Sequence, residues 1–159
     1  MKILLLACMI VLLNAKKIDD ILAEFDEEEA DVHNGVTELK STSFRQMLKE
    51  DKFTFVLFYD PTCPHCKQVI PKYEQLGLLM KNNNKTSIAR LNCDTYHSFC
   101  LKLTFVKGYP SLFLIHKDIV YPEYKMSFSP EAMKDWIEYM IGHYNNNNAI
   151  EEKYIKTEL

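Results

Sequence analysis

The sequence predicts an α/β domain over residues 35–144, in which one β-sheet is covered by helices. The first observation is that strand-like and helix-like segments alternate along these residues, in the order β-α-β-α-β-α-β-β-α. The second is the run Phe53–Tyr59, which is almost wholly apolar and aromatic, as expected of a strand covered on both faces. The third is size, because 159 residues with 47% hydrophobic content suffice for one domain with a core. We find neither an internal repeat nor a second domain in the sequence.

Two strands and two helices are predicted in the first half of the domain. Residues Val36–Lys40 form a short strand, and the hydroxyls of residues 41–43 suit the start of a helix. The apolar face of that helix consists of Phe44, Met47 and Leu48. The strand Phe53–Tyr59 then leads into a helix from about Pro64 to Met80. Its first residue is a proline, which fits the first turn because no N–H is needed there, whereas Pro71 inside the helix is expected to kink it.

The second half of the domain is predicted to hold three strands and a short helix. A strand over Thr86–Asn92 is followed by a helix around Thr95–Leu103. Two further strands, Ser111–His116 and Ile119–Tyr124, are joined by a tight turn at Lys117-Asp118. These segments complete the alternation of strands and helices on which the fold class depends.

The last predicted helix begins at Ser129-Pro130-Glu131, with a capping serine and a proline at the first helical position. Its core face consists of Ala132, Met133, Trp136, Ile137, Met140 and Ile141. A polar tail, residues 145–159, follows and ends in Lys-Thr-Glu-Leu. This ending resembles the Lys-Asp-Glu-Leu retrieval signal of the endoplasmic reticulum, with Thr in place of Asp. The alternative is an ordinary polar tail, in which case an exported chain would be secreted.

Residues 1–15 are predicted to be a secretory signal peptide. A short basic start precedes the apolar run Ile3–Leu13, and Ala15 is small enough to precede the cleavage site. A signal anchor or a buried helix is the alternative, but the run is short for a bilayer and Lys16 follows at once. The mature chain is therefore expected to have no membrane span. The acidic segment 16–34 is expected to be a solvated helix or a loose tail without chemistry.

Composition excludes two classes of protein. The net charge is -3 and the lysines and arginines do not cluster, so nucleic acid is not an expected partner. An aromatic content of 12% argues against a disordered chain. Of the five cysteines, four remain after signal cleavage, which in an exported chain suggests an oxidising compartment and two bridges. The triplet that begins at Asn84 is a candidate glycosylation site.

The pair Cys63 and Cys66 carries the predicted chemistry. The two cysteines directly follow the buried run and stand at the start of a predicted helix, where two intervening residues allow a small disulfide. Free N–H groups and the helix dipole stabilise a thiolate at Cys63, and positive charge on His65 would lower its pKa further. A stabilised thiolate attacks disulfides and also leaves them easily. The pattern therefore predicts thiol–disulfide exchange.

Three motifs in the same order resemble a catalytic domain of the protein disulfide isomerase family. Residues 58–67 resemble its Phe-Tyr-Ala-Pro-Trp-Cys-Gly-His-Cys-Lys, and residues 71–74 match the helix that follows. Residues 108–112 resemble its Gly-Tyr-Pro-Thr-Leu. The resemblance implies a thioredoxin fold, with a central mixed sheet flanked by helices.

The same resemblance implies roles for individual residues. Cys63 would be the attacking thiolate and Cys66 the resolving thiol. Pro110 would be a cis-proline that exposes the backbone of Tyr109, so that an extended client segment can pair with it. The dipeptide Pro64-His65 also occurs in a strongly oxidising periplasmic oxidase, which implies a site at least as oxidising as that of the usual isomerase.

The chain departs from the family pattern at three positions. Leu57 replaces a buried Glu that moves the proton of the resolving thiol, so Cys66 is expected to deprotonate slowly. Thr62 replaces a Trp that lies over the active site. Lys107 replaces an Arg, which keeps the charge but not the planar guanidinium, and it is a candidate modulating residue.

The remaining two mature cysteines, Cys93 and Cys100, resemble a structural bridge of some domains in this family. The bridge would close a short loop, and a second redox-active pair is the alternative. Zinc is not expected, because a structural site needs four ligands and the spacing of these cysteines is unlike the usual second half of one. His97, between them, is expected to be a solvated helix residue. We expect no cofactor.

The sequence thus predicts a thiol–disulfide oxidoreductase in the lumen of the endoplasmic reticulum. Its expected partners are folding client proteins with cysteines or disulfides, a reoxidising protein or glutathione, and a retrieval receptor that reads the chain's ending. A client-binding chaperone or adaptor with weak redox activity is the alternative, favoured by the changes at Leu57 and Thr62 and opposed by the presence of both active-site cysteines.

Overall fold

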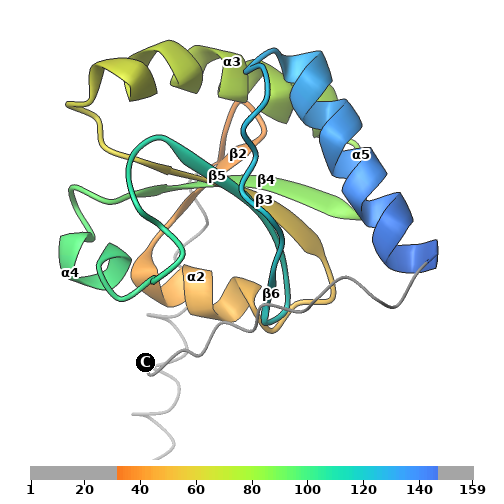
Figure 1. Cartoon of the computed structure of the whole chain (residues 1–159), viewed down its shortest axis with the longest axis horizontal. Helices are drawn as coiled ribbons and strands as arrows, with labels where there is room; N and C mark the ends of the chain where they lie inside the picture. Colours follow the sequence, from red (N-terminus) through yellow and green to blue (C-terminus); the bar gives the residue numbers. More distant parts are fainter. Residues whose placement is uncertain (1–31, 147–159) are drawn as a thin grey trace, which may run out of the picture. The chain divides into compact units, whose positions relative to one another are not determined.

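Six strands form one mixed sheet in the order β1-β2-β4-β3-β5-β6 (Figure 1). The structure is a computed structural model, and it describes residues 32–146. The predicted signal segment 1–15, most of the acidic segment 16–34 and most of the tail 145–159 lie outside the described residues. Within the described residues, the structure confirms the predicted fold class, a mixed sheet flanked by helices.

The centre of the sheet is β3 (Phe53–Tyr59), which is buried along its whole length. It pairs in parallel with β4 (Thr86–Asn92) and antiparallel with β5 (Ser111–His116). On the far side, β4 pairs in parallel with β2 (Val36–Leu39). The bounds of β3, β4 and β5 confirm the three predicted strands. β3 and β5 are buried along their whole length, as strands covered on both faces should be, whereas β4 alternates buried residues with partly exposed ones.

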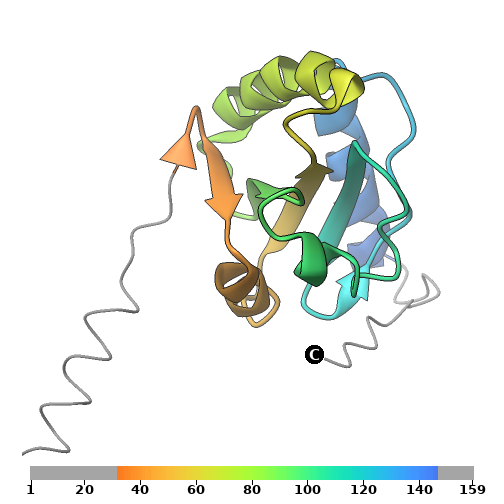
Figure 2. The ribbon, with the colours of Figure 1, turned by 90° about the vertical axis from the view of Figure 1, so that its left-hand side faces the viewer.

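One edge of the sheet is the strand β1 (Val32–His33), which pairs antiparallel with β2 (Figure 2). This strand was not predicted, because it lies in the segment 16–34 that was expected to be solvated. The turn between the strands consists of Asn34 and Gly35, at φ 53° and 74°. A side chain at Gly35 would also collide with the backbone of α3, since its Cβ would lie 2.5 Å from the carbonyl oxygen of Gly77. The Asn-Gly pair was the sequence signal for this hairpin.

The opposite edge is the strand β6 (Ile119–Val120), which is shorter than the predicted strand Ile119–Tyr124. The prediction was wrong beyond residue 120 because Pro122 has no N–H to donate to the neighbouring strand. The chain nevertheless continues beside β5. The N–H groups of Tyr121 and Tyr124 still donate to carbonyl oxygens of β5, and the N···O distance is 2.9 Å in both bonds.

Helices cover both faces of the sheet (Figure 1). On one face lie α3 (Pro64–Met80) and α5 (Pro130–Asn146), and on the other lie α2 (Ser41–Met47) and α4 (His97–Cys100). The side chains of β3 alternate between two apolar clusters, one beneath each helical layer. The cluster with α3 and α5 includes Phe55, Leu57, Cys66, Tyr73 and Met133. The cluster with α2 and α4 includes Val56, Phe58, Phe44, Phe99 and Phe113.

The helix boundaries agree with the sequence for α3 and at the start of α5, whereas α5 continues two residues past the predicted end at residue 144. The residue before α2 is Lys40, whose N–H donates to the Oγ of Ser43 at 2.8 Å, so the predicted hydroxyls lie within the first turn. α3 has the predicted bounds and continues through Pro71, although the expected kink stays a prediction. α5 begins at Pro130, where the Oγ of Ser129 accepts the N–H of Ala132 at 3.2 Å as the predicted cap. α4 ends before the predicted residue 103, because the chain tightens there into bonds between residues three apart.

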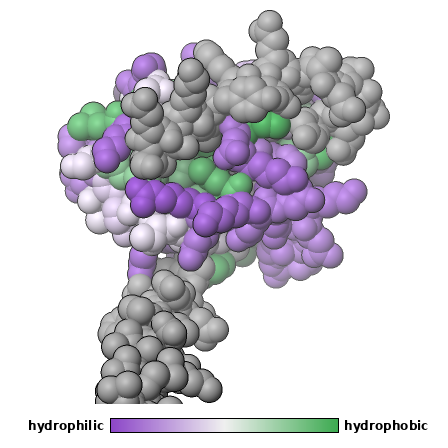
Figure 3. All heavy atoms as spheres, turned by 90° about the horizontal axis from the view of Figure 1, so that it is seen from below, coloured by the Kyte–Doolittle hydropathy of each residue, from purple (hydrophilic) through white to green (hydrophobic). Residues whose placement is uncertain are grey.

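The described surface carries separate exposed apolar side chains. Figure 3 shows the molecule from below, with apolar areas lying among hydrophilic ones. Among the described residues, the large apolar side chains that are exposed are Val32, Leu78, Leu79, Leu101, Met126 and Tyr139. None of the helices formed by residues 32–146 is both long enough and apolar enough to span a membrane.

Candidate active site

The nucleophile position, Cys63, lies where the central strand β3 passes into α3. Its backbone is extended, at φ -67° and ψ 123°, and it is the residue directly before the first helical turn. Pro64 is the first residue of α3, and the carbonyl of Cys63 accepts the N–H of Lys67 at 3.2 Å. The Cys63 side chain is therefore at the N-terminal end of a long helix, as the sequence predicted.

The loop before Cys63 is held by Asp60, which sequence analysis did not single out. Its Oδ1 accepts the backbone N–H of Thr62 at 2.7 Å and the hydroxyl of Thr62 at 2.6 Å. Its carbonyl accepts the N–H of Cys63 at 3.1 Å. The bonds from Thr62 hold the pKa of this exposed carboxyl below its ordinary value. The signal was the Asp-Pro-Thr run, because Asp commonly bonds the backbone two residues ahead.

Cys63 is a free, partly exposed thiol that the structure places in an anion-stabilising position. The pKa of Cys63 is lowered, chiefly because the backbone N–H of Cys66 donates to its sulfur. The backbone N–H of His65 contributes in the same direction, and the His65 side chain is exposed. The part of His65 that stabilises the thiolate in this geometry is thus its backbone N–H.

Cys66 is also a free thiol, but it is buried, with no exposed surface. Burial raises its pKa to about 11, because the thiolate would lose its hydration there. Leu57 of β3 belongs to the same apolar cluster and is likewise fully buried. The position that carries a carboxylate in the resembled family is therefore apolar in the folded protein.

The loop between α4 and β5 brings Tyr109 and Pro110 to the active-site cysteines. The peptide bond between Tyr109 and Pro110 is cis. The carbonyl oxygen of Tyr109 lies 3.6 Å from the Sγ of Cys63, which donates to it when it is a thiol. Lys107 is exposed in the same loop, and among the described residues it makes no bond with either cysteine. The structure thus brings the predicted backbone site at Tyr109 and Pro110 to the four residues of the cysteine motif, while its geometry does not test a modulating role of Lys107.

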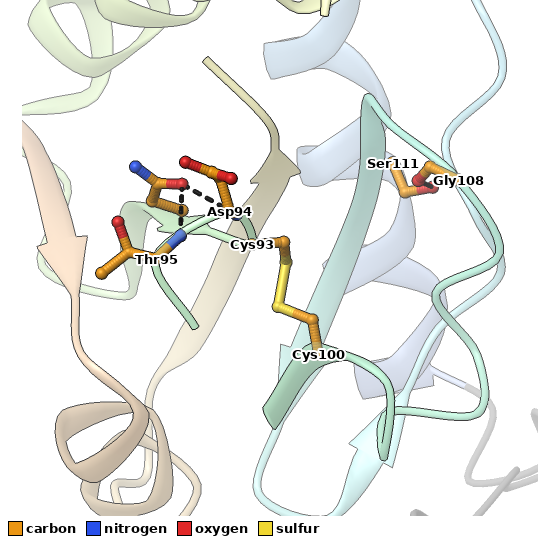
Figure 4. Close-up of a disulfide and its surroundings, with 7 residues drawn as sticks. Cys93, Asp94, Thr95, Cys100, Gly108 and Ser111 are labelled. Atoms are coloured by element: carbon orange, nitrogen blue, oxygen red, sulfur yellow. Dashed lines mark hydrogen bonds between the residues drawn. A yellow bond between two sulfur atoms is a disulfide. The ribbon is translucent and has the colours of Figure 1, made fainter. Parts of the chain in front are cut away.

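The remaining cysteines form a disulfide between Cys93 and Cys100, shown in Figure 4. The bond ties the residue after β4 to the end of α4, and both cysteines are buried. Asn92 shapes the turn between them, because its Oδ1 accepts the N–H groups of Asp94 at 3.0 Å and Thr95 at 3.2 Å. The arrangement suits a structural bridge, since neither sulfur is open to a client.

A charged cluster that sequence analysis did not predict lies on the α3 side of the sheet. Arg90 of β4 donates to the carboxylate of Glu38 in β2. It also donates to the carboxylate of Glu74 in α3, at an N···O distance of 2.9 Å. The Tyr59 hydroxyl donates to Glu38 at 3.0 Å, and burial raises the pKa of Tyr59 to about 12, so it remains a donor. In the register of the sheet, Arg90 stands between Glu38 and Leu57. The carboxylates that balance its charge therefore come from β2 and α3, because the neighbour of Arg90 in β3 is a leucine.

Two further predictions concern sites outside the cysteine pair. Asn84 is exposed in the loop between α3 and β4, and His97 is exposed on α4. Within residues 32–146, no group of three or more His, Cys, Asp or Glu side chains is placed to hold a metal ion.

Comparison with known proteins identifies the family. The profile of the Thioredoxin family matches residues 35–139. The chain is 34% identical, over 103 residues, to the rice (Oryza sativa subsp. japonica) protein disulfide isomerase-like 2-2. That match covers 64% of this chain and 28% of the rice protein, so the chain spans under a third of that relative's length.

Two further matches cover more of the other protein. The chain is 28% identical, over 134 residues, to protein disulfide-isomerase 5-1 of Arabidopsis thaliana, and covers 84% of both chains. The first thioredoxin domain of mouse protein disulfide-isomerase A4 superposes with a TM-score of 0.63 at 23% identity, covering 84% of this chain and 93% of that one. With its matching profile and fold, the chain belongs to the thioredoxin family.

Proposed function

We propose that the chain is a thiol–disulfide oxidoreductase of the secretory pathway that acts through Cys63-Pro64-His65-Cys66. The observation that carries the proposal is the opposite shift of the two thiols. The pKa of Cys63 is lowered at the helix start, while burial raises the pKa of Cys66 to about 11. A thiol–disulfide exchange enzyme needs one sulfur that is a thiolate and attacks at neutral pH, and a second that stays protonated until it resolves the mixed disulfide. The named similarity to protein disulfide isomerases supports the same assignment.

Reduction of a client disulfide takes two thiol–disulfide exchange steps. The Cys63 thiolate attacks one sulfur of a client disulfide, so a mixed disulfide forms and the other client sulfur leaves as a thiolate. Cys66 then gives up its proton and attacks the Cys63 sulfur, which releases the second client thiolate and leaves a Cys63–Cys66 disulfide. The reverse sequence oxidises a client dithiol, and the two steps in alternation isomerise client disulfides. After a client has been oxidised, a reoxidising protein or oxidised glutathione would restore the Cys63–Cys66 disulfide.

Client binding would use the backbone beside the active site. The carbonyl of Tyr109, before the cis bond, lies against the Cys63 sulfur at 3.6 Å. An extended client segment that pairs with this backbone brings its disulfide to Cys63 without contacts to particular side chains. The expected clients are therefore folding proteins with cysteines and varied sequences.

The proposed location is the lumen of the endoplasmic reticulum. The predicted signal peptide, the Cys93–Cys100 disulfide and the Lys-Thr-Glu-Leu ending support it. A retrieval receptor would bind the ending, and the protein would be secreted if the ending is not read.

A client-binding chaperone or adaptor is the second candidate. The observation that favours it is the apolar surrounding of Cys66, where Leu57 offers no acceptor for the proton of the thiol. Slow release of a mixed disulfide would make such a protein a better holder than a catalyst.

Insulin reduction by the mature protein separates these candidates. We expect the wild type to reduce insulin with dithiothreitol, and Cys63→Ser to give only the uncatalysed rate. Cys66→Ser keeps the nucleophile, so it is expected to accumulate a mixed disulfide with a client peptide, which Cys63→Ser cannot form. Wild-type activity equal to that of Cys63→Ser would contradict the proposed enzymatic function and favour the client-binding adaptor.

A further inference from the structure

The loop before β4 contains the triplet Asn84-Lys85-Thr86, which has no part in the redox site. It is the one Asn-x-Ser/Thr triplet in the whole sequence. Asn83 organises the loop, because its Oδ1 accepts the N–H groups of Lys85 at 2.9 Å and Thr86 at 3.1 Å. Asn84, by contrast, is exposed, and its side chain has no hydrogen bond to any residue that the structure describes. The folded loop thus depends on Asn83 and leaves Asn84 open to solvent.

The hydroxyl of Thr86 is unusual because, unlike the exposed side chain of Asn84, it is buried. Thr86 is 3% exposed, and its buried Oγ1 has no hydrogen-bond partner among the described residues. A buried hydroxyl without a partner disfavours the folded state. Valine has nearly the same shape without this hydroxyl and suits a strand equally well. The folded domain gains nothing from the hydroxyl, whereas an N-glycosylation acceptor requires it.

We propose that Asn84 is N-glycosylated during export, an inference that rests on the secretory location in the proposed function. In the transfer, the Nδ2 of Asn84 bonds to the first carbon of an oligosaccharide carried on a polyprenyl pyrophosphate. The bond from that carbon to the pyrophosphate oxygen breaks, the amide gives one proton to a base of the host's transferase, and the lipid pyrophosphate leaves with the electron pair of the broken bond. Because Thr86 is buried after folding, the triplet must be recognised before β4 pairs with β3.

The position of Asn84 keeps the glycan away from the active site. β3 and β4 run parallel, and Asn84 precedes β4 whereas Cys63 follows β3. The two residues therefore lie at opposite ends of the sheet, separated by a strand length of about 23 Å at roughly 3.3 Å per residue. The glycosylated protein is expected to reduce insulin as fast as the unglycosylated Asn84→Gln variant.

The test uses the full chain expressed in a eukaryotic secretory host, with its mass measured before and after peptide-N-glycosidase treatment. We expect the wild type to lose the mass of one glycan. Asn84→Gln and Thr86→Val are expected to lose none, whereas Thr86→Ser keeps the hydroxyl and the glycan. A wild type without a glycan, or a Thr86→Val variant with one, would overturn the inference.

A second measurement tests the role of the hydroxyl without any glycan. In the Asn84→Gln background, adding Thr86→Val is expected to raise the Tm by about 2–8 °C, as removal of one unpaired polar group should. A lowered Tm would show that folding itself requires the hydroxyl, and the reason given for its retention would be wrong.

A reporter acceptor separates this inference from the proposed location. The pair Glu27→Asn and Glu29→Thr creates an acceptor triplet in the acidic segment and is tested together with Asn84→Gln. If the reporter is modified while Asn84 in the wild type is not, the chain is exported and only the glycosylation inference fails. If neither is modified, the secretory location fails with it.

Discussion

A glutamate at position 57 should supply what Cys66 lacks, an acceptor for its proton. Leu57 is fully buried in β3 and shares an apolar cluster with Cys66. Its partner in the sheet register is Arg90 of β4, which already carries two carboxylate partners. A carboxylate introduced by Leu57→Glu would stand beside this guanidinium and on the same face of the sheet as the buried thiol. We therefore expect Leu57→Glu to accelerate release of the client from the mixed disulfide.

The size of the effect follows from the pKa of the resolving thiol. With a pKa of about 11, only about one Cys66 in 10,000 is ionised at pH 7. An ordinary cysteine with a pKa of about 8.5 would be roughly 300-fold more ionised at the same pH. Release at pH 7 should accordingly be about 100–300-fold faster in Leu57→Glu, because general base catalysis typically contributes at least about 100-fold and the difference in ionisation is roughly 300-fold. In the wild type, release should rise about tenfold per pH unit from about pH 7 to 10, because the thiolate is the reacting form.

Rapid mixing of the reduced protein with oxidised glutathione measures this step. Samples are quenched with acid, and mass spectrometry follows the glutathione adduct on Cys63 as it decays to the Cys63–Cys66 disulfide. Leu57→Gln is the matched control, because it has the same shape and a polar group but no charge. Both variants place a polar group in the core and lose stability, so the assay is run below their unfolding temperatures.

Equal decay rates for Leu57→Glu and Leu57→Gln would refute the reasoning. A wild-type decay that does not change between pH 7 and 9 would refute it as well, since release would then not depend on ionisation of the buried thiol.

Three further outcomes follow from the structure. Asp60→Asn should lower the pKa of Cys63, because the negative charge of the carboxylate disfavours the thiolate, while the amide oxygen of Asn still accepts the hydrogen bonds of the loop. The pH profile of iodoacetamide alkylation measures the pKa of Cys63, and an unchanged or raised value would contradict this prediction. Tyr73→Phe should cost about 1–3 kcal/mol in urea unfolding, because the buried hydroxyl lies 2.6 and 2.8 Å from two backbone carbonyl oxygens, between which its single proton is shared; no loss would exclude this role. Replacing Cys93 and Cys100 by alanine should cost about 2.5 kcal/mol through loss of a short closed loop but leave insulin reduction intact. Loss of insulin reduction in a folded double variant would favour a second redox pair instead.

Much of the fold was predictable because the residues within each central strand or helix are enough to indicate that element. β3, β4 and β5 have the bounds expected from the sequence, and α3 has the bounds expected from its periodicity and its first-turn proline. Among the strands, the errors fall at the sheet edges. A two-residue strand such as β1 has no periodicity of its own, and β6 stops where Pro122 interrupts its hydrogen bonds.

The candidate site was predictable where the chemistry lies within a few residues. The spacing of Cys63 and Cys66 and their place after a buried strand indicated the nucleophile at a helix start. The charged cluster of Arg90 and its two carboxylates was not predictable, because its members lie up to 52 residues apart. Their pairing depends on the order of strands in the sheet, to which a single sequence gives little access.

The amino-acid sequence by itself determined the alternation of elements, the buried central strand and the cysteine pair at the start of α3. Local periodicity and helix-end chemistry act over a few residues, so they can be seen in the sequence. Only the tertiary structure decided that Tyr109 lies against Cys63 and that Cys66 is buried next to an apolar β3. The physical reason is that the pKa of a thiol depends on the solvent and the hydrogen-bond donors around it, and these come from segments that only folding brings together.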